Sequence, residues 1–245
     1  MLTNSNNEAA EKPYVVCHML TSIDGKIDGE FFSCPKSLTA VVEYGNIRGF
    51  YNCGATLYGT TTMLGGYAAG KADKLPKSAQ QLKKEDYMAP NDIKNYIVSL
   101  DPKGILAFDS PYSERKGRPK AHIIEVLTDK ASSDYLAYLQ KVGISYIFAG
   151  KDKFDCSVLL HKLKTVFGIN RLMIAGGGVT NWSFAAESLI DELSIIIAPV
   201  ADGGTKSVSV FEQFGDTSHP PVPFTLKEAK AVQGNAVWLR YIKSI

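Results

Sequence analysis

The stretch RLMIAGGGVTNWSF, Arg171–Phe184, joins a run of apolar residues to three consecutive glycines and then to a second apolar segment. The pattern predicts a buried strand that ends at the glycines and a helix that begins near Ser183. Glycines at such a place have two interpretations. They form a tight turn, or they leave the main chain bare so that a phosphate group can approach it without meeting a β-carbon. The N–H groups at the start of a helix attract anions, which gives the second interpretation a physical basis.

Apolar runs of strand length recur along the whole chain and alternate with helical patterns. Strands are predicted over residues 14–20, 55–59, 95–100, 122–127, 144–150 and 171–176, and helices over residues 38–51, 132–143 and 156–168. Such alternation argues for an α/β fold with a mainly parallel central sheet and helices on both of its faces.

The C-terminal part of the chain departs from this alternation. Three β-branched runs, separated by turn signals, predict that the sheet finishes in antiparallel edge strands, at residues 192–200, 223–232 and 236–245. We expect one domain over residues 13–245, preceded by a flexible tail over residues 1–12.

Bulk composition disfavours several functional classes. The net charge is +2, from 27 basic and 25 acidic residues, so no binding to nucleic acid or to an anionic membrane surface is expected. No apolar run has the length of a membrane-spanning helix. The four cysteines form no C-x-x-C pair, and the N-terminal tail lacks the features of a signal peptide, so we expect a reducing, cytoplasmic setting.

Two partial phosphate-binding fingerprints are incomplete. Gly65–Ala72, GGYAAGKA, has the G-x-x-x-x-G-K spacing, but Ala72 stands where a P-loop needs Ser or Thr, and Pro76 interrupts the helix that should follow. Gly176–Asn181, GGGVTN, lies late in the chain and lacks the third glycine of a Rossmann loop. Neither H-x-E nor P-C-x-x-C, the zinc-binding pattern of deaminases, occurs, so no metal site is predicted.

Three segments, in this order, are together similar to a known family: TSIDGKI (21–27), LYGTTTM (57–63) and MIAGGGVTNWSFAAESLIDELSIIIAP (173–199). They resemble the RibD C-terminal family of riboflavin biosynthesis reductases, which shares the dihydrofolate reductase fold. The resemblance extends over nearly the whole chain.

This resemblance implies an NADPH-dependent oxidoreductase. Its substrate would be a phosphorylated pyrimidine, 5-amino-6-(5-phosphoribosylamino)uracil or the 2,5-diaminopyrimidine analogue, whose ribosyl group is reduced to ribityl by hydride transfer to C1′. Members of the family commonly form homodimers. The implied cofactor-binding residues are Gly59, Thr62, Gly66, Ser99, Leu100, Asp101, Ala149, Gly150, Ala175, Gly176, Gly177, Gly178, Val179 and Thr180.

Catalytic and substrate-binding roles are expected for a few polar residues. His18 shares one face of the first strand with the S-x-D-G-K loop, so it is either a catalytic donor near the sugar or a buried core histidine. Asp101, at a strand end, is either catalytic and ribose-binding or a turn cap. Ser22, Asp24 and Lys26 match the family's substrate loop, and their alternative is an ordinary turn with a solvated lysine.

Two other functions stay open. A dihydrofolate or pterin reductase would need an acid on the helix after the first loop, where the first nearby acid is Glu43. A non-catalytic nucleotide-binding protein could retain the same fold. Many family members carry an acidic residue beside the glycine loop, where this chain has Ala175. The candidates for binding the substrate phosphate are Lys71 and Lys74.

Overall fold

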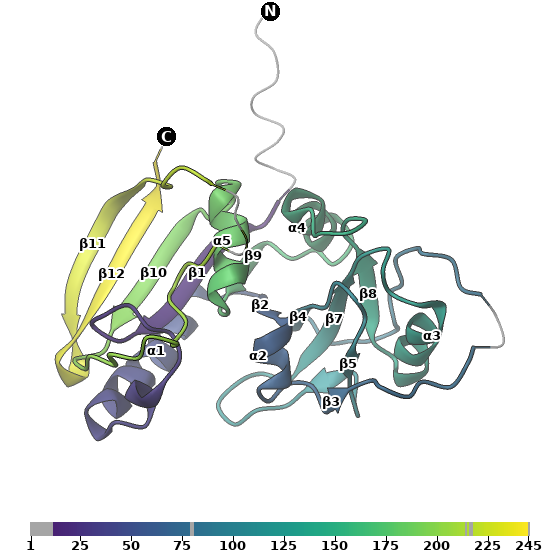
Figure 1. Ribbon diagram of the computed structural model, residues 1–245, viewed down its shortest axis with the longest axis horizontal. Helices are drawn as coiled ribbons and strands as arrows, with labels where there is room; N and C mark the ends of the chain where they lie inside the picture. Colours follow the sequence, from purple (N-terminus) through teal and green to yellow (C-terminus); the bar gives the residue numbers. More distant parts are fainter. Residues whose placement is uncertain (1–11, 79–80, 214, 216–217, 245) are drawn as a thin grey trace, which may run out of the picture. The chain divides into compact units, whose positions relative to one another are not determined.

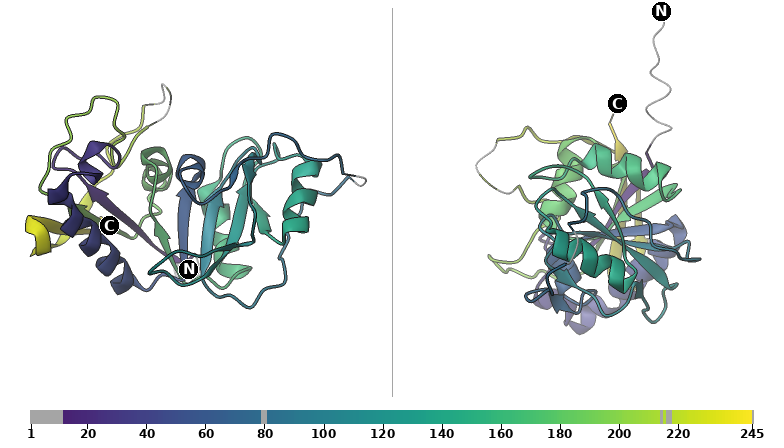
Figure 2. Two further views of the ribbon diagram at one scale, coloured as in Figure 1. Left: turned by 90° about the horizontal axis from the view of Figure 1, so that it is seen from below. Right: turned by 90° about the vertical axis from the view of Figure 1, so that its right-hand side faces the viewer.

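The computed structural model describes residues 12–78, 81–213, 215 and 218–244 (Figures 1 and 2). The tail predicted for residues 1–12 therefore lies, apart from Lys12, outside the described residues. The chain falls into two compact units, of which unit 1 holds Gly54–Asn170 with the stretch before Tyr14, and unit 2 holds Tyr14–Cys53 and Arg171–Ile245. The expectation of a single domain over residues 13–245 stays a prediction.

Unit 2 is built around the first strand and the C-terminal third of the chain. Its elements are β1 (Tyr14–Thr21), the short 3-10 helices η2 (Glu30–Phe32) and η3 (Pro35–Ser37), α1 (Leu38–Tyr51), β9 (Arg171–Ile174), α5 (Gly178–Ala186), β10 (Glu192–Ile197), β11 (Phe224–Val232), η4 (Gln233–Asn235) and β12 (Ala236–Lys243).

The sheet of unit 2 has the strand order β11-β12-β10-β1-β9. β1 runs parallel to both β9 and β10, whereas β12 runs antiparallel to β10 and β11. α1 and α5 lie on opposite faces of this sheet (Figures 1 and 2). The predicted antiparallel ending is thus confirmed, since β12 is antiparallel to both of its neighbours. On its other side β10 pairs with β1 in parallel, because a helical crossover through α5 delivers β10 in the direction of β9 and β1.

Unit 1 also combines helices with a sheet. Its elements are β2 (Ala55–Gly59), α2 (Thr60–Leu64), β3 (Gly70–Lys71), β4 (Tyr96–Leu100), β5 (Leu106–Ala107), β6 (Tyr112–Ser113), β7 (Ala121–Leu127), α3 (Ser133–Val142), β8 (Ser145–Phe148) and α4 (Cys156–Thr165). β2, β4, β7 and β8 are parallel, β6 is antiparallel to β7, and β3 and β5 form a separate antiparallel pair. The predicted α/β fold with a mainly parallel sheet is therefore confirmed.

Local sequence explains the main helices and strands. β1 is buried along almost its whole length, which suits its β-branched sequence in the middle of a parallel sheet. α3 begins where the hydroxyl of Ser132 accepts the N–H of Tyr135, and it ends at Gly143 in the left-handed conformation. α4 begins at Asp155 in the same way. Among the described residues, no helix combines the length and apolar character needed to cross a membrane.

Candidate functional site

The predicted site residues belong to both units. Unit 2 holds His18, Ser22, Asp24, Lys26 and the loop 175–180, whereas unit 1 holds Gly59, Thr62, Gly66, Ser99–Asp101, Ala149 and Gly150.

The glycine loop of unit 2 connects the buried end of β9 to α5. Gly177 is the N-cap of α5, with φ +80°, and no side chain caps the first turn of the helix. α5 begins at Gly178, not near Ser183 as expected, and the Ser183 hydroxyl donates to the carbonyl of Val179 inside the helix. The helix therefore presents main-chain N–H groups at its first turn, which is the arrangement that attracts an anion.

The glycines of this loop are needed for different reasons. A β-carbon on Gly177 would meet only the side chain of Thr180, at 3.5 Å, so the space beside it is open and its positive φ is what favours glycine. A β-carbon on Gly178 would collide with the carbonyl oxygen of Ser209 and lie 3.1 Å from Cγ of Glu212. The chain itself therefore packs against Gly178 on this side, and its contact with the coenzyme stays a prediction.

The segment that packs there is residues 200–212, for which the sequence predicts no more than a turn signal at Asp202-Gly203-Gly204. Its Glu212 N–H donates to the carbonyl of Gly178 at 3.1 Å, and the Asn181 side chain donates to the carbonyl of Val210 at 2.8 Å. Further along, the segment also binds the S-x-D-G-K loop, because the Ile27 N–H donates to Val208 at 2.8 Å. Residues 200–212 therefore link the glycine loop to the predicted substrate loop within unit 2. The pair Gly203-Gly204 is the sequence signal that points to such a close-packed loop.

Asp24 is the centre of the S-x-D-G-K loop. The hydroxyl of Ser22 donates to its carboxylate at 2.6 Å, and the backbone N–H groups of Asp202 and Gly203 donate at 2.9 Å each. These hydrogen bonds, that of Ser22 first, lower the pKa of Asp24, so the exposed carboxylate is ionised. The backbone N–H of Lys26 donates to the hydroxyl of Ser22 at 2.9 Å, and this hydrogen bond closes the loop. The three predicted substrate residues thus lie together.

His18 belongs to β1, and its side chain is completely buried against α1. Its ring stacks on Tyr44 at 4.5 Å, its Nε2 lies 3.0 Å from the Tyr44 carbonyl, and its Nδ1 lies 2.9 Å from the hydroxyl of Ser194. The carbonyl can only accept, so Nε2 carries the proton and Nδ1 accepts from Ser194, whose oxygen in turn accepts the indole N–H of Trp238 at 2.8 Å. Burial lowers the pKa of His18 to about 4. These contacts are those of a core histidine, and its catalytic role stays a prediction.

The loop after β2 joins predicted cofactor residues of unit 1. α2 starts directly after Gly59, and the hydroxyl of Thr60 donates to the carbonyl of Leu100 at 2.6 Å. This bond holds the start of α2 against the end of β4, so Gly59, Thr62 and Leu100 belong to one corner of unit 1. Gly66 follows α2 with φ +145°.

Asp101 is fully buried just beyond β4. Its carboxylate accepts the backbone N–H groups of Gly104, Ile105 and Leu106 at 2.6–3.1 Å and the hydroxyl of Tyr135 at 3.1 Å. Four donors fill the accepting positions of this carboxylate, so Asp101 fixes the turn that follows β4. Its predicted catalytic role is not tested by these contacts.

Glu125 is a buried carboxyl group that sequence reasoning missed. It stands opposite Ser99 in the parallel pairing of β4 and β7, so the two side chains share a face. Among the described residues, the carboxylate oxygens of Glu125 and the hydroxyl of Ser99 have no hydrogen-bond partner within bonding geometry. Burial and then the charge of Asp101 raise the pKa of Glu125 well above its usual value. The signal for it was an acid within the apolar run HIIEVL.

Ala149 and Gly150 directly follow β8. A β-carbon on Gly150 would collide with the carbonyl oxygen of Lys153, and φ is +118° there. Packing of the turn before α4 therefore accounts for a glycine at this position, and its contact with the coenzyme stays a prediction.

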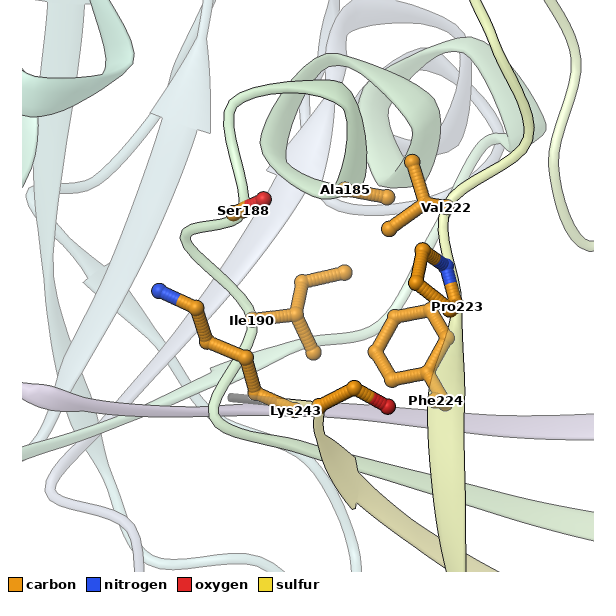
Figure 3. Close-up of a pocket in the computed structure, with 8 residues that line it drawn as sticks. Ala185, Ser188, Ile190, Val222, Pro223, Phe224 and Lys243 are labelled. Carbon is orange, nitrogen blue, oxygen red and sulfur yellow. The ribbon is translucent and has the colours of Figure 1, made fainter.

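Unit 2 contains a hollow with a volume of about 60 Å³. Figure 3 shows residues that line it. It is lined mainly by apolar side chains, with Lys243 at its rim, and contains none of the predicted site residues. A hollow of this size is too small for a nucleotide, since ligand pockets usually measure roughly 300–1,000 Å³.

Known proteins are similar to this chain in sequence or in fold. A protein of Archaeoglobus fulgidus named 2,5-diamino-6-ribosylamino-4(3H)-pyrimidinone 5′-phosphate reductase is 27% identical over 206 residues, which are 81% of this chain and 86% of that protein. The solved structure of Acinetobacter baumannii RibD matches with a TM-score of 0.64 and 19% identity, over 96% of this chain and 59% of that chain. A pyrimidine reductase-like protein of Corynebacterium diphtheriae matches with a TM-score of 0.66 and 16% identity, over 99% and 96% of the two chains.

The two structures share the fold, and the family assignment rests on the sequence profile. The profile of the RibD C-terminal domain matches residues 13–238, nearly the whole chain. The protein therefore belongs to the RibD C-terminal domain family.

Proposed function

We propose that this protein is an NADPH-dependent reductase of riboflavin biosynthesis. Its substrate would be 2,5-diamino-6-ribosylamino-4(3H)-pyrimidinone 5′-phosphate or the deaminated uracil analogue, and its product the corresponding ribityl compound. The observation that carries the proposal is the family match over residues 13–238, joined by a relative of that activity whose length this chain covers to 86%. The substrate would be a phosphorylated pyrimidine, a small molecule.

The glycine loop of unit 2 fits the diphosphate of a dinucleotide. The first turn of α5 has no side-chain cap, and the space beside Gly177 is open except for the side chain of Thr180. Main-chain N–H groups at a helix N-terminus carry partial positive charge, which suits a diphosphate. Val179 and Thr180 belong to the same turn and would contribute their N–H groups, with Ala175 and Gly176 leading into it.

In unit 1 the corner at the end of β2 and β4 carries further residues that the resemblance assigns to coenzyme binding. Gly59 allows a close main-chain approach, Thr62 offers a hydroxyl on α2, and the Thr60–Leu100 bond keeps the two strand ends together. Gly66, Ser99, Ala149 and Gly150 complete the predicted set. Asp101 would act as a positioning residue, because its carboxylate holds the turn that follows β4.

The S-x-D-G-K loop would orient the substrate. The exposed, ionised carboxylate of Asp24 can accept hydroxyl groups of a sugar, and its position is fixed by bonds from Ser22 and the 202–203 turn. The Nζ of Lys26 donates to the carbonyl of Ser207 at 3.2 Å, and this hydrogen bond fixes the lysine side chain within the loop. When bound, NADPH would supply the hydride that reaches C1′. His18, with both ring nitrogens bonded inside unit 2, would support β1 beneath this loop.

An assay of NADPH oxidation at 340 nm with the ribosylamino-pyrimidine 5′-phosphate tests the proposal. Turnover of this substrate, with none of dihydrofolate, is the expected result. Turnover of dihydrofolate alone would identify a pterin reductase, and tight NADPH binding without turnover of either compound would identify a non-catalytic nucleotide-binding protein. His18→Gln separates its two roles, because a loss of kcat with unchanged KM would mark a catalytic residue, whereas a lowered Tm with unchanged kcat would mark a core residue.

A homodimer and a cytoplasmic location stay predictions. Light scattering coupled to size-exclusion chromatography, at several protein concentrations, would measure the number of chains in solution.

A further inference from the structure

Residues 114–120, ERKGRPK, carry the densest positive charge that the proposed function has not used. The segment holds four basic residues and one acidic residue, in a chain whose net charge is only +2. Two of the basic residues, Arg115 and Arg118, contact Tyr58 and Tyr67, and these four residues are termed the arginine–tyrosine cluster. The whole cluster lies in unit 1.

Arg118 fixes the two tyrosines of the cluster. Its Nη1 donates to the hydroxyl of Tyr58 at 2.7 Å and to that of Tyr67 at 2.9 Å, and the Tyr67 hydroxyl donates to that of Tyr58 at 2.8 Å. The two rings lie 4.5 Å apart. Burial raises the pKa of Tyr67 to about 12, so the phenol is neutral and does not neutralise the arginines. Tyr67 is thus a fixed platform beside two positive charges.

Arg115 lies on this platform. Its guanidinium carbon is 3.7 Å from the centre of the Tyr67 ring, and its Nη2 donates to the carbonyl of Gly66. The side chain is nevertheless exposed, and no carboxylate of the described residues pairs with it. By contrast, Lys120 in the same segment pairs with Glu114 at 2.7 Å. The guanidinium is therefore oriented by two contacts while its charge is left without an anion.

Capping of α2 does not explain the position of Arg115. The carbonyls at the end of α2 already accept main-chain N–H groups, since Thr61 accepts from Gly65 at 3.0 Å and Met63 accepts from Tyr67 at 2.8 Å. The bond of Arg115 goes to Gly66, beyond the helix. A planar guanidinium with several N–H donors, stacked on an aromatic ring, is the group that proteins use to bind phosphate in a bidentate manner.

We propose that Arg115, held by Tyr67 and Arg118, binds a phosphate monoester. The inference rests on the proposed function, because Gly66, which Arg115 contacts, is one of the predicted coenzyme residues. The proposed reaction involves two phosphate monoesters, the 2′-phosphate of NADPH and the 5′-phosphate of the pyrimidine substrate. Both present a dianion with three terminal oxygens, which matches two neighbouring arginines.

The test compares ligands that differ only in the monoester. Titration calorimetry with 2′-AMP against adenosine isolates the 2′-phosphate, and ribose 5-phosphate against ribose isolates the 5′-phosphate. Each pair is measured with the wild-type protein, Arg115→Ala, Arg115→Lys and the control Lys120→Ala. Arg115→Ala should raise the dissociation constant of one phosphorylated ligand by about tenfold or more, because hydrogen bonds to a charged group are lost. The dissociation constant of its unphosphorylated counterpart should not change. The affinity of Arg115→Lys for the phosphorylated ligand should lie between those of Arg115→Ala and the wild type. Lys120→Ala should bind it as the wild type does.

The ligand pair that responds identifies the source of the phosphate. The inference is wrong, and the arginine–tyrosine cluster is only structural, if Arg115→Ala binds both members of each pair as the wild type does. The same holds if the affinity for both members falls by the same factor. Arg115→Lys keeps the positive charge and loses the planar, bidentate fork, so its reduced affinity for the phosphorylated ligand decides the matter if Arg115→Ala fails to fold. Failure of NADPH itself to bind to the wild-type protein would contradict the proposed function, whereas normal NADPH binding with unresponsive variants would contradict this inference alone.

Discussion

The carbonyl oxygen of Ser209 occupies the position that a β-carbon on residue 178 would need, so Gly178 and Ser209 pack together with no side chain between them. Gly178 →Ala should therefore destabilise the protein by roughly 1–3 kcal/mol, the usual cost of overpacking a close contact. Thermal unfolding should show a Tm lowered by about 2–4 °C for each kcal/mol.

The control for this prediction is Gly45→Ala on the exposed face of α1. No atom lies within 4 Å of the added β-carbon, and alanine is favoured over glycine in a helix, so stability should rise by roughly 0.5–1 kcal/mol. A Gly178→Ala variant as stable as the wild type would show that residues 200–212 do not pack on α5 in solution.

Gly177→Ala should separate ligand binding from folding. The backbone has φ +80° and ψ 123° at this residue, which lies outside the left-handed helical region, so alanine costs roughly 1–3 kcal/mol through strain, while the space beside it is open. If a diphosphate lies against the first turn of α5, the new methyl group should raise the dissociation constant for NADPH by about tenfold, measured by fluorescence titration.

Gly168→Ala is the matched control for the change at Gly177. Gly168 has φ +66° and equally open surroundings, but it follows α4 and belongs to no predicted site. It should lose similar stability and keep the affinity for NADPH. Equal affinities in both variants would mean that the glycine loop only turns the chain.

The order of strands and helices was readable from the sequence, because periodicity and caps act locally. The helix over residues 38–51 and the strand over residues 14–20 agree with α1 and β1 nearly to the residue. The start of α5 was misplaced, because a glycine N-cap carries no side-chain signal. The parallel pairing of β10 with β1 was missed, since register between distant segments depends on the crossover and not on either strand.

Site contacts were harder to predict than elements. Nothing in S-x-D-G-K says that Asp24 receives its N–H donors from residues 202–203, about 180 positions away in the chain. The burial of His18 follows from α1 covering that face of β1, which the period of two cannot reveal. Arg115 and Arg118 are surface-like in sequence, and only the fold brings them onto Tyr67.

The two buried histidines should make the protein labile to acid. Burial lowers the pKa values of His18 and His122 to about 4, whereas unfolded histidine has a pKa near 6.5. As the pH falls from 6.5 to 4, the unfolded state takes up protons that the folded state does not, so stability decreases by up to about 1.4 kcal/mol per pH unit for each histidine. Urea unfolding at a series of pH values measures this slope.

Removing one histidine should flatten the pH dependence. In His122→Gln the slope between pH 6.5 and 4 should decrease, because one titrating group is gone while the bond to the Ser145 hydroxyl, 2.8 Å in the wild type, can be remade by the amide. His219→Gln, at an exposed position, should leave the slope unchanged. A wild-type stability that is level over this pH range would contradict the buried, neutral state of both rings.

Glu125 should have the opposite pH dependence. Burial raises its pKa well above the value near 4.5 of the unfolded chain, so the folded protein keeps a proton that the unfolded chain releases. Its stabilising contribution is therefore complete below pH 4.5 and is lost as the pH rises through the folded pKa.

Glu125→Gln carries a neutral side chain of the same shape, so its stability relative to the wild type should increase with pH. Urea unfolding between pH 5 and 9 measures the difference, and Glu114→Gln, at an exposed position paired with Lys120, should follow the wild-type curve. If Glu125→Gln ran parallel to the wild type throughout, the carboxyl group would be ionised in the folded protein, and a cation or a ligand group would have to stand beside Ser99 to balance it.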